Sequence, residues 1–147
     1  MRTMKLIGFC LAVYLPTSAF AASTVPILDA RASREECSTF SQAGMRDCLV
    51  KKAESSQKAL TQAEQKVAST LSKWDEDNKY VSQSKAKLVA SNKEFAKYRE
   101  TQCDFSASLS GGGAGNAHEI GRLACIAELN NRRAEQLRDA VSDLALK

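Results

Sequence analysis

Three long stripes of small and apolar residues constrain the fold of this chain more than any other feature. They span residues 49–74, 81–98 and 120–144, and within each the small or apolar positions recur mostly at steps of three and four. Such steps place side chains on one face of an α-helix, and no stretch alternates apolar and polar residues long enough to demand a sheet. The sequence therefore predicts an all-α fold: a long antiparallel helical hairpin with a third packed helix.

The N-terminus has the three parts of a secretory signal peptide. Arg2 and Lys5 precede an apolar run over residues 6–15, and small residues stand at Ala19 and Ala21. We expect cleavage after Ala21, which makes residues 1–21 a signal peptide. Residues 22–34 are expected to form a flexible leader, residues 35–147 the helical domain, and the protein to reach the periplasm or the exterior.

Four cysteines remain once the signal peptide is removed, because the fifth, Cys10, lies inside it. An even count in a small exported chain indicates two disulfides, so the helical fold is expected to be stapled twice. A metal site is not expected, because zinc ligands usually come in close pairs. Here the nearest cysteines are Cys37 and Cys48, and the chain has a single histidine.

Four cysteines allow three connectivities. The local pattern, Cys37–Cys48 with Cys103–Cys125, is preferred because shorter loops cost less entropy to close. The alternative joins Cys48 to Cys103 and Cys37 to Cys125. It remains open because Cys48 and Cys103 lie almost equally far from a hairpin turn near Asp77, and would sit at one level on antiparallel helices.

The segment 106–116 changes character, since its glycines each cost about 1 kcal/mol in a helix. It is expected to be the one flexible loop of the domain and a candidate for partner binding, with Asn116 as a possible cap of the next helix. The residues assigned to this candidate binding loop are Ser108, Ser110, Gly111, Gly112, Gly113, Gly115, Asn116 and His118.

Catalysis and nucleic-acid binding are not expected. There is one histidine, and no nucleophile elbow, phosphate loop or zinc-binding helix motif occurs. The formal net charge of +4 includes Arg2 and Lys5, so the domain is close to neutral and lacks the clustered positive charge that nucleic acids require. No cofactor is expected, no segment after the signal peptide is long enough to span a membrane, and the oligomeric state stays open.

Two segments carry a family resemblance. Residues 37–48 (CSTFSQAGMRDC) resemble the paired-cysteine opening of the LprI-type lysozyme-inhibitor N-terminal domain. Residues 94–103 (EFAKYRETQC) are similar to that family's run of an aromatic residue, then aromatic-Arg-acidic, then Cys. The resemblance covers about residues 34–140. It departs from the family pattern at Phe95, where a Trp is usual, and in residues 56–64, which lack the usual Asn and Tyr.

The resemblance implies a non-enzymatic protein that binds and inhibits lysozyme. The glycine loop is expected to be the inhibitory segment, because it is the one segment free to protrude into a cleft. The alternative is an envelope interaction module whose helical faces bind another protein. The motif Phe95, Tyr98, Arg99 and Glu100 is expected to be structural. Arg99 would tie its helix to a neighbour, with Glu100 or Glu35 as partner, and Tyr98 would pack with Phe95 against the third helix.

Overall fold

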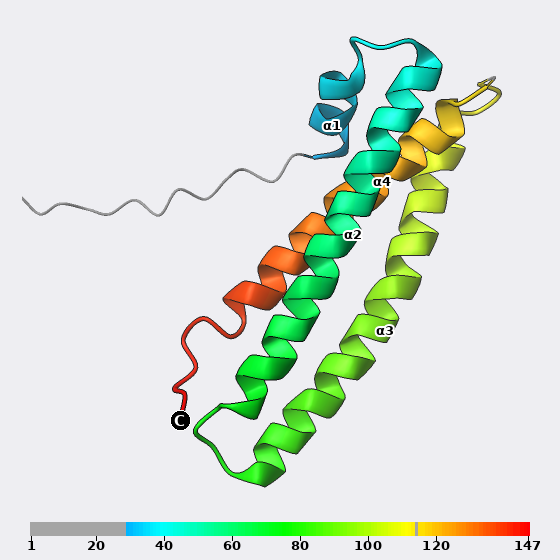
Figure 1. Ribbon diagram of the computed structural model, residues 1–147. Coiled ribbons are helices and arrows are strands. Elements are labelled where there is room, and N and C mark those ends of the chain that lie inside the picture. Colours follow the sequence, from blue (N-terminus) through cyan, green and yellow to red (C-terminus); the bar gives the residue numbers. More distant parts are fainter. Residues whose placement is uncertain (1–28, 114) are drawn as a thin grey trace, which may run out of the picture.

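The computed structural model describes residues 29–113 and 115–147, and this part of the chain is built from four helices (Figure 1). They are α1 (Ala30–Cys37), α2 (Gln42–Ser72), α3 (Asn78–Ser108) and α4 (Ala117–Asp139). The all-α fold with a long hairpin and a further packed helix is confirmed. The expected signal peptide and residues 22–28 of the expected leader lie outside the described residues.

Local capping explains where the first two helices begin. The carboxylate of Asp29 accepts a hydrogen bond from the backbone N–H of Ala32 at 2.7 Å, so α1 starts at Ala30. The hydroxyl of Ser41 accepts from the N–H of Gly44 at 3.3 Å at the start of α2. The expected leader therefore ends earlier than residue 34, because its last five residues belong to α1.

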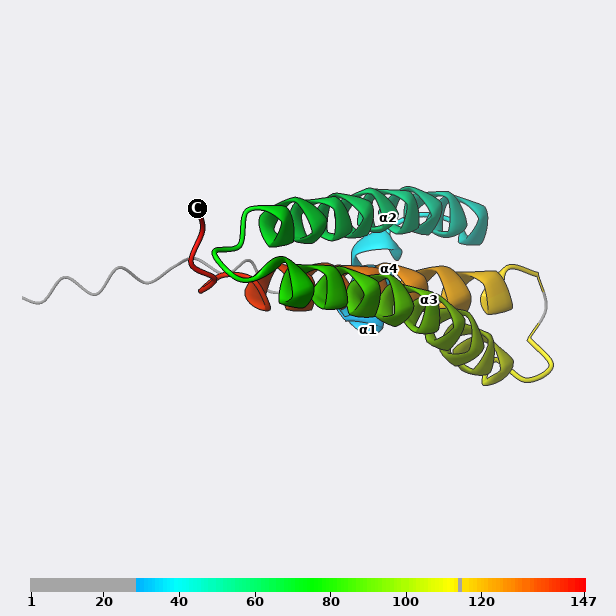
Figure 2. The ribbon, with the colours of Figure 1, turned by 90° about the horizontal axis from the view of Figure 1, so that it is seen from below.

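The three long helices do not contribute equally to the packing. α2 and α3 run antiparallel and are joined by the turn at residues 73–77, while α4 returns in the direction of α2 (Figures 1 and 2). The most extensive contact is between α2 and α4, followed by that between α3 and α4, whereas α2 and α3 touch each other least. The hairpin is thus held together mainly through α4.

The core is thin and consists of two clusters. One lies between α2 and α4, where small and branched side chains are buried, and the other lies beside α1 around Leu49 and the first disulfide. α3 contributes only Cys103 and Ala107 to the buried residues. The buried members of the first cluster are Leu60, Ala63, Val67, Leu71, Ala134 and Leu137.

The third stripe outlasts its helix. α4 ends at Asp139, where the Ser142 hydroxyl donates to the Asp139 carbonyl at 2.9 Å and offers the backbone an alternative to the helix. Val141 and Leu144 nevertheless pack on the first cluster. The C-terminal segment, residues 140–147, lies beside the end of α2, where Leu146 forms an isolated β-bridge with Trp74.

The expected loop is shorter than predicted, because α3 continues through Ser108. Serine and alanine cost a helix much less than glycine, and Ala107 gains by burial, so the helix stops only near the first glycine. In residues 29–113 and 115–147, no helix combines the length and apolarity that a membrane span requires.

Candidate functional site

Both disulfides lie toward the end of the molecule where α2 and α4 begin and α3 finishes (Figure 1). Cys37 is bonded to Cys48, joining α1 to α2, and Cys103 is bonded to Cys125, joining α3 to α4. Their Cα atoms are 5.9 and 5.4 Å apart, within the range that disulfides adopt. The structure therefore contains the local pairing, and the alternative pairing is wrong. We call this region the braced end.

The loop between α3 and α4 stands at the braced end and is bracketed by the second disulfide. Gly111 and Gly115 adopt φ angles of +55° and +70°, which side chains on L-residues disfavour. Gly113 N–H donates to the Ser110 carbonyl at 3.0 Å, so part of the loop is a hydrogen-bonded turn. Gly115 lies near the start of α2, because a Cβ there would be 3.6 Å from the amide oxygen of Gln42.

The base of the loop is tied to the helix before it. Nδ1 of His118 lies 2.9 Å from the Ala107 carbonyl oxygen, and the Ser110 hydroxyl lies 3.5 Å from the carbonyl of Ala117. Asn116 makes no side-chain capping bond to α4, contrary to expectation. Its backbone carbonyl instead accepts from Ile120 N–H at 2.8 Å. The loop candidates from Ser108 to His118 are thus brought together on a fixed base.

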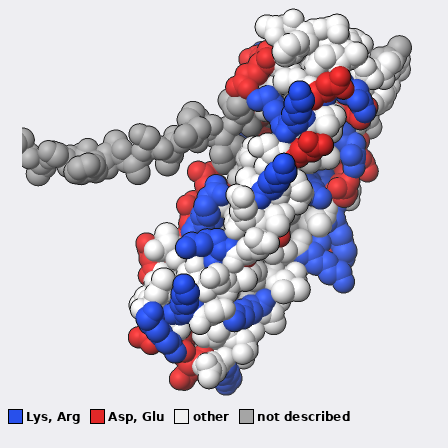
Figure 3. Space-filling view, in the orientation of Figure 1, with Lys and Arg blue, Asp and Glu red and all other residues white. Residues whose placement is uncertain are grey.

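Exposed apolar side chains stand beside this loop. Phe40 precedes α2, and Phe105 and Leu109 stand at the end of α3; their exposed fractions are 57%, 58% and 71%. Gly44 makes room for Phe40, since a Cβ at Gly44 would lie only 2.8 Å from the Phe40 Cβ. Figure 3 shows an uncharged tip at this end, with acidic and basic groups interspersed directly below it and along the body.

Ion pairs bind the starts and ends of the helices together below the loop. Arg46 on α2 donates two hydrogen bonds to Glu119 on α4, at 2.6 and 2.9 Å. This hydrogen bonding raises the pKa of Arg46 and lowers the pKa of Glu119. Arg122 pairs with Asp104 at 2.9 Å and also with Glu100. The bond to Asp104 is the main cause that raises the pKa of Arg122.

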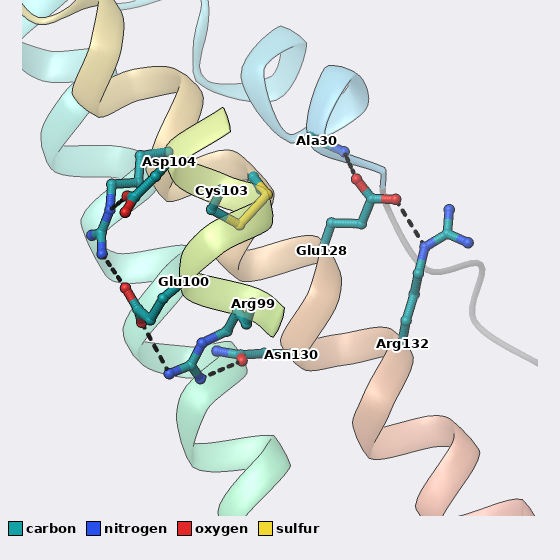
Figure 4. The surroundings of a disulfide bond; sticks show 10 residues. Ala30, Arg99, Glu100, Cys103, Asp104, Glu128, Asn130 and Arg132 are labelled. Atoms are coloured by element: carbon teal, nitrogen blue, oxygen red, sulfur yellow. Dashed lines mark hydrogen bonds and ion pairs between the residues drawn. A yellow bond between two sulfur atoms is a disulfide. The ribbon is translucent and has the colours of Figure 1, made fainter. Parts of the chain in front are cut away.

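Arg99 joins the three long helices (Figure 4). Its Nη1 donates to the Asn130 side-chain oxygen on α4 and to the Gln57 oxygen on α2, both at 2.8 Å. Its Nη2 lies 3.3 Å from Glu100, one of the two expected partners, while Glu35 pairs with Arg31 instead. Arg99 therefore lies where α2, α3 and α4 meet and links the three helices by hydrogen bonds.

The two aromatic residues of the motif behave differently. Phe95 is partly buried against the first core cluster, with the guanidinium of Arg133 5.6 Å from its ring centre. Tyr98 lies on the side of α3 that faces α4, together with Phe95, but it stays 54% exposed. Its side chain lines a groove of about 510 Å³ between α3 and α4, which the sequence reasoning missed. The signal for it was the four-residue spacing of Glu128, Arg132 and Gln136 on one face of α4.

Carboxylates and histidine are scattered rather than gathered. Within the described ranges, no group of three or more His, Cys, Asp or Glu side chains could hold a metal ion. The acidic groups nearest the braced end, Glu119, Asp104 and Glu100, are engaged by arginines. The arrangement suits binding through a presented loop.

Fold and site together define a small helical domain that is cross-linked by two disulfides and presents a braced loop. The family model Lysozyme inhibitor LprI matches residues 33–137, and the chain belongs to this family. No curated protein and no solved structure matches the chain. The disulfides and the family are those of an extracytoplasmic protein.

Proposed function

We propose that this protein binds lysozyme and inhibits it by placing the α3–α4 loop in the substrate cleft. Lysozyme cleaves a glycosidic bond with two carboxyl groups that flank an open cleft. A segment that fills this cleft excludes the glycan strand, and its N–H and O–H groups can donate hydrogen bonds to the carboxylates. The protein would act by binding alone, as the family name implies.

The observation that carries the proposal is the rigid mounting of a glycine-rich loop. The loop stands between two helices joined by Cys103–Cys125, and its base is tied through His118 and Ser110. A mounted loop loses less conformational entropy on binding than a free one. Gly111, Gly112 and Gly113 carry no side chains, so their backbone can approach a partner closely.

Leu109 supplies the apolar contact next to the loop. It is 71% exposed at the C-terminal cap of α3, so its side chain does not support the fold. Burying such a side chain against a partner contributes about 1.5–3 kcal/mol. We therefore assign Leu109 to the edge of the lysozyme contact, with the loop residues Ser110 to Gly115 entering the cleft.

The test is a muramidase assay with purified protein and two matched variants. Leu109→Asp changes the proposed contact, and Val89→Asp changes an equally exposed residue, at 70%, in the body of α3. We expect inhibition by the wild type and by Val89→Asp, and at least about tenfold weaker inhibition by Leu109→Asp. Shortening the loop by Gly111, Gly112 and Gly113 should abolish inhibition with unchanged helicity.

Two results would count against the proposal. If the loop-shortened protein inhibits fully, the loop is not the inhibitory segment, and the helix faces would have to make the contact. If saturating wild-type protein leaves muramidase activity unchanged, the interaction-module alternative takes the place of lysozyme inhibition. The assay should include lysozymes of differing charge, because a domain close to neutral offers little electrostatic steering toward a strongly basic enzyme.

Export through the N-terminal signal is part of the same proposal. The native protein should begin at Ala22 and be recovered from the periplasm or the medium with both disulfides formed. Intact-mass measurement of the native protein checks this. A mass that includes Met1, or four free thiols, would contradict it.

A further inference from the structure

The groove between α3 and α4 is separate from the proposed lysozyme contact. It lies on the side of the bundle where α1 begins, and Ala30 stands at its edge. Its volume of about 510 Å³ is in the range of small-molecule sites. Its lining combines two aromatic rings, two amides and two guanidinium groups, contributed by Phe95, Tyr98, Gln102, Gln136, Arg132 and Arg133.

Arg132 lines this groove, and among the described residues only part of its guanidinium is engaged. Its Nε is bonded to Glu128 at 2.8 Å, and the other Glu128 oxygen accepts from the Ala30 N–H at 2.9 Å. Figure 4 shows the two outer nitrogens of Arg132 pointing away from Glu128. The side chain is 55% exposed, and these nitrogens donate to no residue in the described ranges. A planar fork held in this way is suited to a carboxylate.

Arg133 keeps the walls of the groove in place. Its Nη2 donates to Ser91 at 2.7 Å and to Asn92 at 3.2 Å, both on α3, and its guanidinium lies over the Phe95 ring. These contacts reach from α4 across to α3, the pair of helices that forms the groove. Arg133 is therefore a positioning residue, while Arg132 is the group available to a ligand.

Tyr98 and the two glutamines define the rest of the ligand. Tyr98 leaves about half of its surface open beside the groove, and the face of an aromatic ring is electron-rich. The weakly positive C–H groups on one face of a sugar ring complement such a surface. Gln102 and Gln136 can each donate and accept hydrogen bonds, which hydroxyl and acetamido groups require.

We propose that the α3–α4 groove binds a saccharide that carries a carboxylate. Arg132 holds the carboxylate, Tyr98 stacks on the sugar ring, and Gln102 and Gln136 bond its hydroxyl or acetamido groups. Glu128 pairs with Arg132 and its second oxygen is engaged by Ala30, while Arg133 bonds only neutral groups on α3, so the groove lining keeps an excess of positive charge for a carboxylate. Such a ligand could come from a muramic-acid glycan or from a uronic-acid polysaccharide, which share this chemistry.

The test is calorimetric titration of the full mature protein with three disaccharides. N-acetylglucosaminyl-N-acetylmuramic acid and a glucuronic-acid disaccharide carry the carboxylate, and N,N′-diacetylchitobiose, called chitobiose below, is the neutral match. We expect at least one acidic disaccharide to bind about tenfold or more tightly than chitobiose. The acidic disaccharide that binds more tightly identifies the source.

Variants assign the binding to the groove. Arg132→Gln should remove the preference for the acidic sugar, and Tyr98→Ala should weaken every disaccharide that binds. Arg138→Gln on α4 and Tyr80→Ala on α3 replace exposed residues of the same kinds outside the groove, and should change nothing. Muramidase inhibition should be unaffected by Arg132→Gln and Tyr98→Ala, which separates this proposal from the loop proposal.

Any one of the following results would overturn the assignment. The first is that no disaccharide binds at about 10 mM. The second is that chitobiose binds as tightly as the acidic sugars, or that the control variants lose as much affinity as the groove variants. The third is that a short acidic peptide, such as acetyl-Asp-Asp-Asp, binds more tightly than either acidic disaccharide, which would make the groove a peptide site.

Discussion

Replacing Arg99 should expose how a thin core depends on one buried polar crossing. Asn130 is fully buried, and its side-chain oxygen accepts from Arg99 at 2.8 Å while its amide donates to the Ser56 hydroxyl at 3.2 Å. Arg99→Met removes that donor but keeps most of the apolar stem. A buried oxygen that loses its donor costs about 1–3 kcal/mol, so we expect a loss of stability of that size.

The partner substitution should cost less. Asn130→Leu leaves Arg99 bonded to Gln57 at 2.8 Å and to Glu100 at 3.3 Å, and the added apolar burial offsets part of the loss. We expect about 1 kcal/mol of destabilisation. The double variant lacks both the Asn130 oxygen that would have no donor and the Arg99 guanidinium that would have no Asn130 acceptor. Its destabilisation should therefore be smaller than the sum of the two single changes by about 1–2 kcal/mol.

Urea unfolding followed by far-UV circular dichroism, with the disulfides intact, measures all four corners of this cycle. With slopes of about 1–2 kcal/mol per molar urea, the coupling corresponds to roughly 1 M in the unfolding midpoint. Arg138→Met combined with Asn130→Leu is the control, because Arg138 is exposed and should show no coupling. Additivity of Arg99→Met and Asn130→Leu within about 0.5 kcal/mol would refute the argument.

Three further predictions concern the two ends of the bundle. Replacing Cys103 and Cys125 by Ser should lower the stability by about 3.4 kcal/mol, because their sequence separation is 22 residues; the same change at Cys37 and Cys48, 11 residues apart, should lower it by about 2.8 kcal/mol. Urea unfolding of both variants makes the comparison, and the reverse order would contradict the loop-entropy reasoning. Deleting residues 140–147 removes the β-bridge and the backbone hydrogen bonds between this segment and the α2–α3 turn. Amide hydrogen exchange in the turn should accelerate, while the braced end stays protected. Unchanged exchange would show that the C-terminal segment does not stabilise the turn. Hydrogen bonding to Arg46 lowers the pKa of Glu119, so the contribution of the Glu119 carboxylate to stability is present above the unfolded pKa of about 4.3 and is lost as pH falls through the folded pKa. The difference in stability between wild type and Glu119→Gln should therefore be constant above about pH 5 and shrink in acid. A difference that does not change with pH would contradict this.

The sequence alone was enough for the helical class and for the order of the long helices. The steps of three and four in each stripe are a local property of the chain, so they can be recognised without knowing how the helices pack. The same holds for the turn near Asp77 and for the loop glycines. The short-loop argument favoured the local disulfide pairing but left the alternative open, and the structure decided between them. Helix ends were less predictable: α4 stops at Asp139 although its stripe continues to Leu144.

Only the tertiary structure decided which helix holds the others. The stripes of α2, α3 and α4 look alike in sequence, yet α4 packs against both others while α3 buries only Cys103 and Ala107. It also brought Arg99 to Asn130 across 31 positions of sequence, and left Tyr98 half-exposed beside a groove between α3 and α4. The physical reason is that periodicity identifies the apolar face of a helix but not the helix against which that face packs. With few large apolar side chains in the three long helices, the partner depends on the packing of the whole bundle.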